Sequence, residues 1–353
     1  MRYVPVRALR YAARRPGVPA AGLLALALTV LAVSVALAAA APGLRHALTA
    51  HGPRARAVVQ QESGGSSPQV AVGLRVLRFV DDSRTIRPEG GKPEPRTLVT
   101  YVRYPAFGIP GSMDVLDAPA TLAGGPYPLV VFGHGLAVTP QTYTRLLRSW
   151  AQAGFVVAAP LFPLASADSP GGPDEADVIN QPTDMSFVIS SMLALNQSGT
   201  GPLAGLINPA EIAVAGHSDG AETALAVAYS RRYHDPRVRA AVILSGAEMS
   251  GIGGYSFPQG SPPLLAVQGT ADNFNEPRYT YAYFKQARRP KFLLRLQGAG
   301  HLAPYTSQQP QLSTVEQVTS AFLDGYLEQS PDTTGRLAAL GDVARTSALV
   351  AEP

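Results

Sequence analysis

The 353-residue chain contains no cysteine. Disulfide bonds, catalysis by a thiolate and zinc sites built on cysteine are therefore excluded. Charged side chains are also scarce: they make up 15% of the residues, whereas 46% of the residues are hydrophobic. This composition is typical of a globular protein with one large domain or two.

Acidic side chains are absent from the first 61 positions, and the first is Glu62. The same stretch carries eight arginines, so the net charge of +4 originates there. The remainder of the chain has more acidic than basic residues. A basic surface for nucleic acid is therefore not supported, and no nucleic-acid partner is expected.

Charge of either sign is missing from Gly17 to Ala41, where Thr29 and Ser34 are the only polar side chains. A run of this length can span a bilayer of about 30 Å. More arginines precede the run than closely follow it, so the positive-inside rule predicts that the body is translocated. We expect a basic segment at 1–16, followed by a transmembrane anchor or signal sequence at 17–42.

Small residues from Ala38 to Ala41 keep cleavage by a signal peptidase open as an alternative. Residues 43–68 are rich in arginine, glycine, serine and glutamine, and this composition predicts a flexible linker. The expected localisation is membrane-anchored with the body extracytoplasmic. The alternative is a protein secreted after cleavage.

The body, 69–330, begins with strand-like alternation at 70–80 and 98–104, which predicts two antiparallel strands. Apolar runs and helix-like segments then alternate, which predicts a mostly parallel central sheet with helices on both faces. The predicted strands lie at 129–132, 155–159, 212–215, 240–244, 264–267 and 292–296, and the predicted helices at 141–153, 184–195, 221–230, 279–286 and 315–327. Residues 331–353 are expected to form a C-terminal tail with room for one helix.

The sequence Gly216-His217-Ser218-Asp219-Gly220 stands between an apolar run and a helix-like stretch. This is the G-x-S-x-G pattern in the strand–turn–helix context that gives it meaning. A serine at the tip of so sharp a turn has a crowded backbone, so the residues two before and two after it must be small. The turn would raise the serine hydroxyl above the edge of the sheet.

Three further features follow predicted strands at their carboxyl ends, where chemistry belongs in such a sheet. Gly133-His134-Gly135-Leu136 follows the strand predicted at 129–132, and its turn can present the N–H of Leu136 toward the serine. Asp272 and His301 follow two later strands through short glycine-containing turns. Either one alone would usually be a cap or surface residue, but the order Ser, Asp, His at strand ends favours a catalytic site.

Residues 70–327 resemble the α/β-hydrolase superfamily. Tyr104-Pro105-Ala106, the Gly133-His134-Gly135 turn and the G-x-S-x-G motif look most like the dienelactone hydrolase, cutinase and platelet-activating-factor acetylhydrolase branch. The resemblance implies an α/β-hydrolase fold. The short segment from Ser245 to Pro263 leaves no room for a large cap domain.

The resemblance also implies roles for individual residues. Ser218 would be the nucleophile, His301 the general base and Asp272 the acid that orients it. The backbone N–H groups of Leu136 and Asp219 would form the oxyanion hole. Asp219 departs from the superfamily, which often has an apolar or amide residue there, and its carboxylate would repel an oxyanion unless it turned away.

A triad of this kind predicts hydrolysis of a carboxylic ester through an acyl-enzyme, without cofactor or metal. The expected partner is a small-molecule, lipid or polyester ester. Leu136, Phe162 and Phe274 are placed either to form apolar walls of an uncapped cleft or to pack the end of the sheet. A serine acyltransferase or peptidase on the same fold is the alternative, followed by a non-catalytic binding module.

Overall fold

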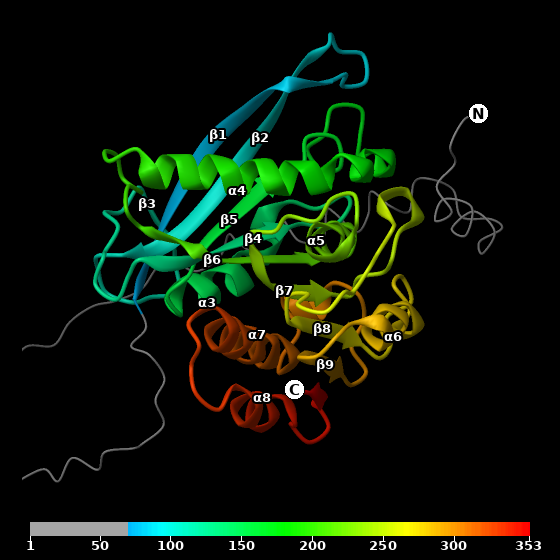
Figure 1. Cartoon of the computed structure of the whole chain (residues 1–353). Coiled ribbons are helices and arrows are strands. Elements are labelled where there is room, and N and C mark those ends of the chain that lie inside the picture. Colours follow the sequence, from blue (N-terminus) through cyan, green and yellow to red (C-terminus); the bar gives the residue numbers. More distant parts are fainter. Residues whose placement is uncertain (1–69) are drawn as a thin grey trace, which may run out of the picture. The chain divides into compact units, whose positions relative to one another are not determined.

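The computed structural model describes residues 70–353 (Figure 1). The basic segment, the anchor or signal and the linker predicted at 1–16, 17–42 and 43–68 lie outside the described residues. Among residues 70–353, none of the helices combines the length and the apolar character that a bilayer span requires.

In the described part of the chain, ten strands form one sheet in the order β10-β9-β8-β7-β6-β4-β5-β2-β1-β3. The six strands from β9 to β5 run parallel to one another, whereas β2 is antiparallel to β5, β1 to β2, and β10 to β9. The strands are β1 (Ala71–Ile86), β2 (Glu94–Ala106), β3 (Val115–Leu116), β4 (Tyr127–Gly133), β5 (Val156–Leu161), β6 (Ile207–His217), β7 (Val238–Leu244), β8 (Leu264–Gly269), β9 (Lys291–Leu296) and β10 (Ser347–Glu352).

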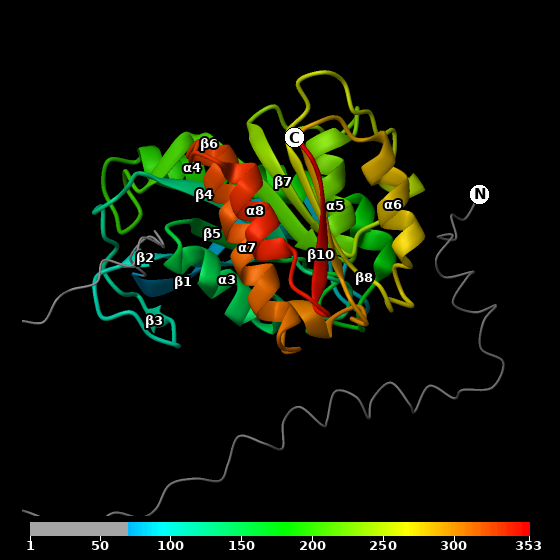
Figure 2. The same cartoon turned by 90° about the horizontal axis from the view of Figure 1, so that it is seen from below.

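Helices cover both faces of this sheet. Helices α4, α5 and α6 pack on one face (Figure 1), and α3, α7 and α8 on the other (Figure 2). The helices are α3 (Thr144–Gln152), α4 (Gln181–Gln197), α5 (Asp219–Tyr229), α6 (Pro277–Gln286), α7 (Gln311–Leu327) and α8 (Thr333–Gly341), with short 3-10 turns η2 (Pro140–Tyr143), η3 (Glu175–Ile179), η4 (Ser250–Ile252) and η5 (Ala303–Tyr305).

The two cores follow from the alternation of side chains along each strand. In β4, Leu129 and Val131 join the core beneath α4 and α5, whereas Val130 and Phe132 join the core beneath α3 and α7. All four are fully buried, as expected for a strand covered on both faces. The continuous apolar run that predicted β4 therefore reflects its central position in the sheet.

The mixed α/β architecture with a mostly parallel sheet agrees with the prediction, and so do the two antiparallel strands at its start. The segment from Ser245 to Pro263 holds only η4 and no cap domain. At the end of the chain, the one helix expected after Ser330 is present as α8, but the tail is part of the fold. Beyond α8, β10 pairs with β9 along its whole length and extends the sheet. Its short sequence gives little indication of a strand, since the pairing depends on the exposed edge of β9.

Candidate active site

Ser218 lies between the end of β6 and the start of α5, with φ +55° and ψ −123°. Two glycines make this turn possible. A methyl group on Gly216 would lie 2.1 Å from the carbonyl oxygen of Gly220, and one on Gly220 would lie 2.1 Å from that of Gly133. The backbone segments thus approach so closely that no side chain fits between them, which is the crowding the motif predicts.

Ser218 is the first member of a chain of hydrogen bonds with His301 and Asp272. The Ser218 hydroxyl lies 2.9 Å from Nε2 of His301, and Nδ1 of His301 lies 2.8 Å from a carboxylate oxygen of Asp272. An ionised carboxylate can only accept, so Nδ1–H donates to Asp272 and Nε2 is left to accept from the serine. The structure therefore brings together the three side chains that sequence analysis singled out.

The Asp272 carboxylate is held in place from several directions. One oxygen accepts from the backbone N–H groups of Phe274 and Asn275, and the other accepts from Gln268 at 3.3 Å. Glu248, by contrast, accepts from Gln286 and does not contact His301. The acid that faces His301 is therefore Asp272.

The turn after β4 packs directly against the serine. A methyl group on Gly135 would lie 3.2 Å from the side chain of Ser218. The neighbouring N–H of Leu136 has no hydrogen-bond acceptor among the described residues. Asp219 follows the serine as the first residue of α5. The backbone N–H groups in the first turn of a helix have no acceptor within the helix. Leu136, through its neighbour Gly135, and Asp219, which follows the serine in the chain, are thus both near Ser218. Their role as an oxyanion hole stays a prediction.

His134 holds this turn against the end of β5. Its Nε2 accepts from the N–H of Phe162 at 2.9 Å, so Nδ1 carries the proton and donates to the carbonyl of Gly135 at 2.8 Å. Complete burial lowers the pKa of His134 to about 4, and the imidazole is neutral at pH 7. Because its ring is neutral and makes two hydrogen bonds, His134 has a structural role and holds this turn in place.

His217, which precedes the serine, belongs to a second hydrogen-bond network that sequence analysis did not find. Its Nε2–H donates to the backbone carbonyl of His301 at 2.8 Å, and its Nδ1 accepts from the hydroxyl of Tyr143 at 2.7 Å. The same hydroxyl accepts from the N–H of Gly135 at 3.3 Å. Tyr143 and His217 thus connect the turn beside the serine with the loop that carries His301.

The three residues predicted to form apolar walls have different surroundings. Phe162 is fully buried and its ring packs on His134, so it belongs to the core rather than to the surface of a cleft. Phe274 is 64% exposed and its ring stacks on that of His301, with centroids 5.2 Å apart. Leu136 is partly buried against the core. Of the three, Phe274 presents the largest apolar surface beside the serine.

The side chain of Asp219 is buried, so its carboxylate lies within the fold. Burial raises the pKa of Tyr143, and the negative charge of Asp219 raises it further. The negative charge of Asp219 therefore affects buried groups such as Tyr143. Its backbone N–H remains at the start of the helix.

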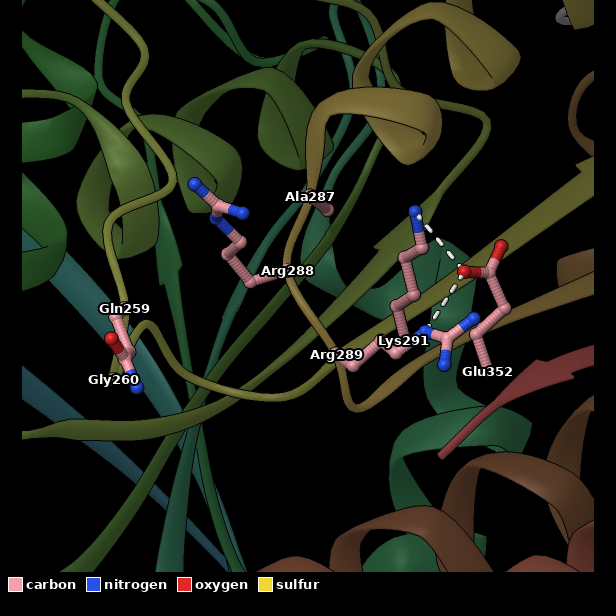
Figure 3. A pocket seen from close by; sticks show the side chains of 7 residues that line it. All are labelled: Gln259, Gly260, Ala287, Arg288, Arg289, Lys291 and Glu352. Carbon is pink, nitrogen blue, oxygen red and sulfur yellow. Dashed lines mark hydrogen bonds and ion pairs between the residues drawn. The ribbon is translucent and has the colours of Figure 1, made fainter.

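A cavity of about 490 Å³ lies elsewhere on the protein (Figure 3). Lys291 is the first residue of β9. The cavity therefore lies at the amino ends of the parallel strands, opposite to the loops that carry Asp272 and His301. Glu352 pairs with Lys291 and Arg289 within it. The remaining lining residues are Gln259, Gly260, Ala287 and Arg288. Among residues 70–353, no group of acidic or histidine side chains is arranged to hold a metal ion.

Comparison with known proteins shows where this chain has relatives. Residues 109–275 match the family model of chlorophyllase. Chlorophyllase-2 of Arabidopsis thaliana is 28% identical over 143 residues, and the alignment spans 40% of this chain but only 41% of that protein. The region matched by the family model contains Ser218 and Asp272 and ends before His301.

Among solved structures, a ferulic acid esterase from Streptomyces cinnamoneus superimposes with a TM-score of 0.56 at 22% identity. The superposition covers 76% of this chain and 94% of the esterase, so the shared fold extends well beyond the region matched by sequence. The sheet topology, the serine turn and these similarities confirm the resemblance to the superfamily, whereas the resemblance to the narrower branch stays a prediction. The chain belongs to the α/β-hydrolase superfamily.

Proposed function

We propose that this protein hydrolyses carboxylic esters through an acyl-enzyme formed on Ser218. The observation that carries the proposal is the continuous chain of hydrogen bonds from Asp272 through His301 to Ser218 at a strained, glycine-flanked turn. The similarity to chlorophyllase and to a ferulic acid esterase supports an ester as the substrate class.

In the proposed mechanism, His301 Nε2 takes the proton of Ser218 as the serine oxygen attacks the ester carbonyl. Asp272 holds the imidazole in the required tautomer and stabilises its positive charge. The N–H groups of Leu136 and Asp219 donate to the oxyanion of the tetrahedral intermediate. His301 then donates its proton to the departing alcohol, and a water molecule activated by the same imidazole releases the acid.

We further propose that the substrate is a small-molecule ester with an apolar group near the scissile bond. The exposed ring of Phe274, stacked on His301, supports this because it offers an apolar surface next to the reacting atoms. We place this chemistry outside the cytoplasm, with the protein held at the membrane by the apolar segment 17–42.

The nucleophile is tested with a fluorophosphonate probe and a short p-nitrophenyl ester. Ser218→Ala removes the attacking oxygen and leaves the turn in place, so we expect loss of both labelling and hydrolysis with an unchanged far-UV spectrum. Digestion and mass spectrometry of the labelled wild type map the modified residue. Labelling that persists in the Ser218→Ala variant would falsify the assignment.

Combined variants test whether the three side chains act as a unit. His301→Ala and Asp272→Asn should each lower kcat by orders of magnitude, and adding either to Ser218→Ala should change little further. If Asp272→Asn retained nearly full activity, the orienting role of Asp272 would be wrong. Product analysis with an added alcohol or amine separates hydrolysis from acyl transfer.

A further inference from the structure

Large apolar side chains gather on the segment 107–122, which we call the apolar corner. Six of the twelve large hydrophobic residues that are exposed in residues 70–353 come from these sixteen positions. They are Phe107, Ile109, Met113, Val115, Leu116 and Leu122, and their exposed fractions lie between 52% and 91%. Isolated exposed hydrophobic residues are ordinary, whereas large exposed apolar surfaces often mark sites of contact with a protein or a membrane. Six such residues within sixteen positions therefore call for an explanation.

The apolar corner carries no uncompensated charge. It contains two acidic residues and no basic one. Asp114 pairs with Arg103 at 2.9 Å and with Arg148 at 2.6 Å, and Asp117 pairs with Arg75 at 2.8 Å. Because arginines of the body neutralise both carboxylates, the corner can approach hydrocarbon without taking an unpaired charge out of water.

The position of the apolar corner links it to the N-terminal part of the chain. β1 begins at Ala71, and a methyl group on Gly108 would lie 3.2 Å from the side chain of Ala71. The chain therefore enters the fold beside the corner. About 28 residues earlier stands the uncharged run from Gly17 to Ala41.

The corner lies at the amino ends of the parallel strands, whereas the serine site lies at their carboxyl ends. Ala106 ends β2 near the beginning of β5, because the two strands are antiparallel and Arg103 pairs with Val157. Ser218 follows the carboxyl end of β6, which is parallel to β5 through β4. Figure 1 shows the β3 region at the left, away from the end of the sheet where α5 begins.

We propose that the apolar corner contacts the lipid bilayer in which the N-terminal apolar segment is anchored. The inference rests on the proposed anchor and is independent of the esterase chemistry. The linker predicted at 43–68 has 26 residues, and a flexible chain of this length has a root-mean-square span of about 25–30 Å. Such a span would keep the corner within reach of the membrane surface. At the resulting high effective concentration, a weak insertion of a few side chains suffices.

The proposal has a consequence for the substrate. With the corner against the bilayer, the serine site faces away from the membrane that holds the protein. The enzyme would then act on esters that reach it from the aqueous side or from a surface opposite the membrane.

A single introduced cysteine tests the contact, because the chain has none of its own. Full-length protein is reconstituted into vesicles of phosphatidylcholine and phosphatidylglycerol, with an NBD dye attached at Ile109→Cys. The matched control is Ile179→Cys, an exposed isoleucine at the end of η3, near the edge where β2 begins. Doxyl-labelled lipid then serves as the quencher.

We expect NBD at position 109 to emit at shorter wavelength than at 179 and to be quenched at least twofold more strongly by doxyl lipid. Adding Met113→Glu to the Ile109→Cys protein should remove most of this difference and leave hydrolysis of a soluble ester unchanged. Equal quenching at the two positions would overturn the proposal. A blue shift at 109 without quenching by lipid would also overturn it, since it would mean that a second copy or the protein's own N-terminal part covers the corner.

Discussion

Ser218 combines the position of the proposed nucleophile with a strained backbone. A non-glycine residue at positive φ costs on the order of 1–3 kcal/mol, and the surrounding structure must hold it there. Gly216 and Gly220 allow the close approach of the flanking segments, and the N–H of Ser218 donates to the carbonyl of Leu244. The strain is thus stabilised by neighbours that the motif itself and the adjacent strand supply.

His134 gives a prediction about pH. Its pKa is lowered by burial to about 4, whereas an unfolded histidine titrates near 6.5. Between these values the unfolded chain binds a proton that the folded protein does not, so the free energy of unfolding should decrease as pH falls from about 6.5 toward 4. The loss has an upper bound of roughly 3 kcal/mol for this group.

Urea titrations at pH 7, 5.5 and 4.5 measure this effect against His134→Gln. The glutamine carbonyl can accept from Phe162 N–H but does not titrate. The stability of the variant should therefore depend less steeply on pH than that of the wild type. Identical slopes would show that His134 is not held neutral.

Tyr143 gives a second prediction at this scale. Tyr143→Phe removes the hydroxyl that contacts Nδ1 of His217 and the N–H of Gly135, and so loosens both the turn beside the serine and the loop of His301. An unsatisfied buried group costs about 1–3 kcal/mol. We expect kcat and the rate of fluorophosphonate labelling to fall together by about tenfold, with KM little changed.

Tyr229→Phe is the matched control. Tyr229 is also buried, and its hydroxyl donates to the carbonyl of Pro262, away from the serine. This variant should lose similar stability without a change in kcat. A comparable loss of kcat in both variants would mean that the role of Tyr143 is only structural.

At the scale of elements, the long β1–β2 hairpin is fastened to the helical layer by a buried ion cluster. Arg96 in β2 donates to Asp177 in η3 and to Asp184 in α4, at distances between 2.6 and 2.8 Å. Arg84 in β1 adds a further pair with Asp184 at 2.8 Å. The cluster thus joins both strands of the hairpin to α4 through buried charges.

Arg96→Met tests this cluster. The variant keeps most of the side-chain volume but leaves two buried carboxylates facing each other without the central cation. We expect the free energy of unfolding to decrease by about 3–5 kcal/mol. Guanidinium denaturation measures the change, and kcat of the remaining folded protein should be unaffected because the cluster does not contact the serine site.

An exposed ion pair provides the comparison. Arg145 pairs with Glu316 across α3 and α7, and its side chain is half exposed. Arg145→Ala should therefore cost less than about 1 kcal/mol. The interpretation of the Arg96 cluster would fail if both variants lost equally little.

At the scale of the whole molecule, the charge pattern of the first 61 residues predicts on which side of a membrane the body lies. Eight arginines and no acidic residue lie in the first 61 positions, on both sides of a run that is uncharged for 25 residues. The greater number of arginines stands before the run, which favours a body outside the cytoplasm.

Membrane fractionation tests this topology. A retained anchor should leave full-length protein and esterase activity in the membrane fraction after a carbonate wash. Cleavage near Ala41 would instead give a soluble protein that begins near Pro42. An intact protein in the cytosol would contradict both alternatives and, with them, an extracytoplasmic substrate.

The sequence by itself determined the features that depend on neighbours in the chain. The serine turn can be recognised in the sequence because the small residues that it requires on either side of Ser218 lie within five positions, Gly216 to Gly220. The parallel sheet is visible because central strands buried on both faces read as continuous apolar runs. Asp272 and His301 could be singled out because parallel strands place their carboxyl ends at one edge.

Tertiary structure decided the features that depend on distant partners. Phe162 lies in the core because His134, 28 positions earlier, packs on its ring. The contact between Tyr143 and His217 joins residues 74 positions apart. β10 becomes a strand only because β9 offers an unpaired edge. Local sequence encodes turns and periodicity, whereas burial and hydrogen-bond partners arise when the folded sheet brings separate segments into contact.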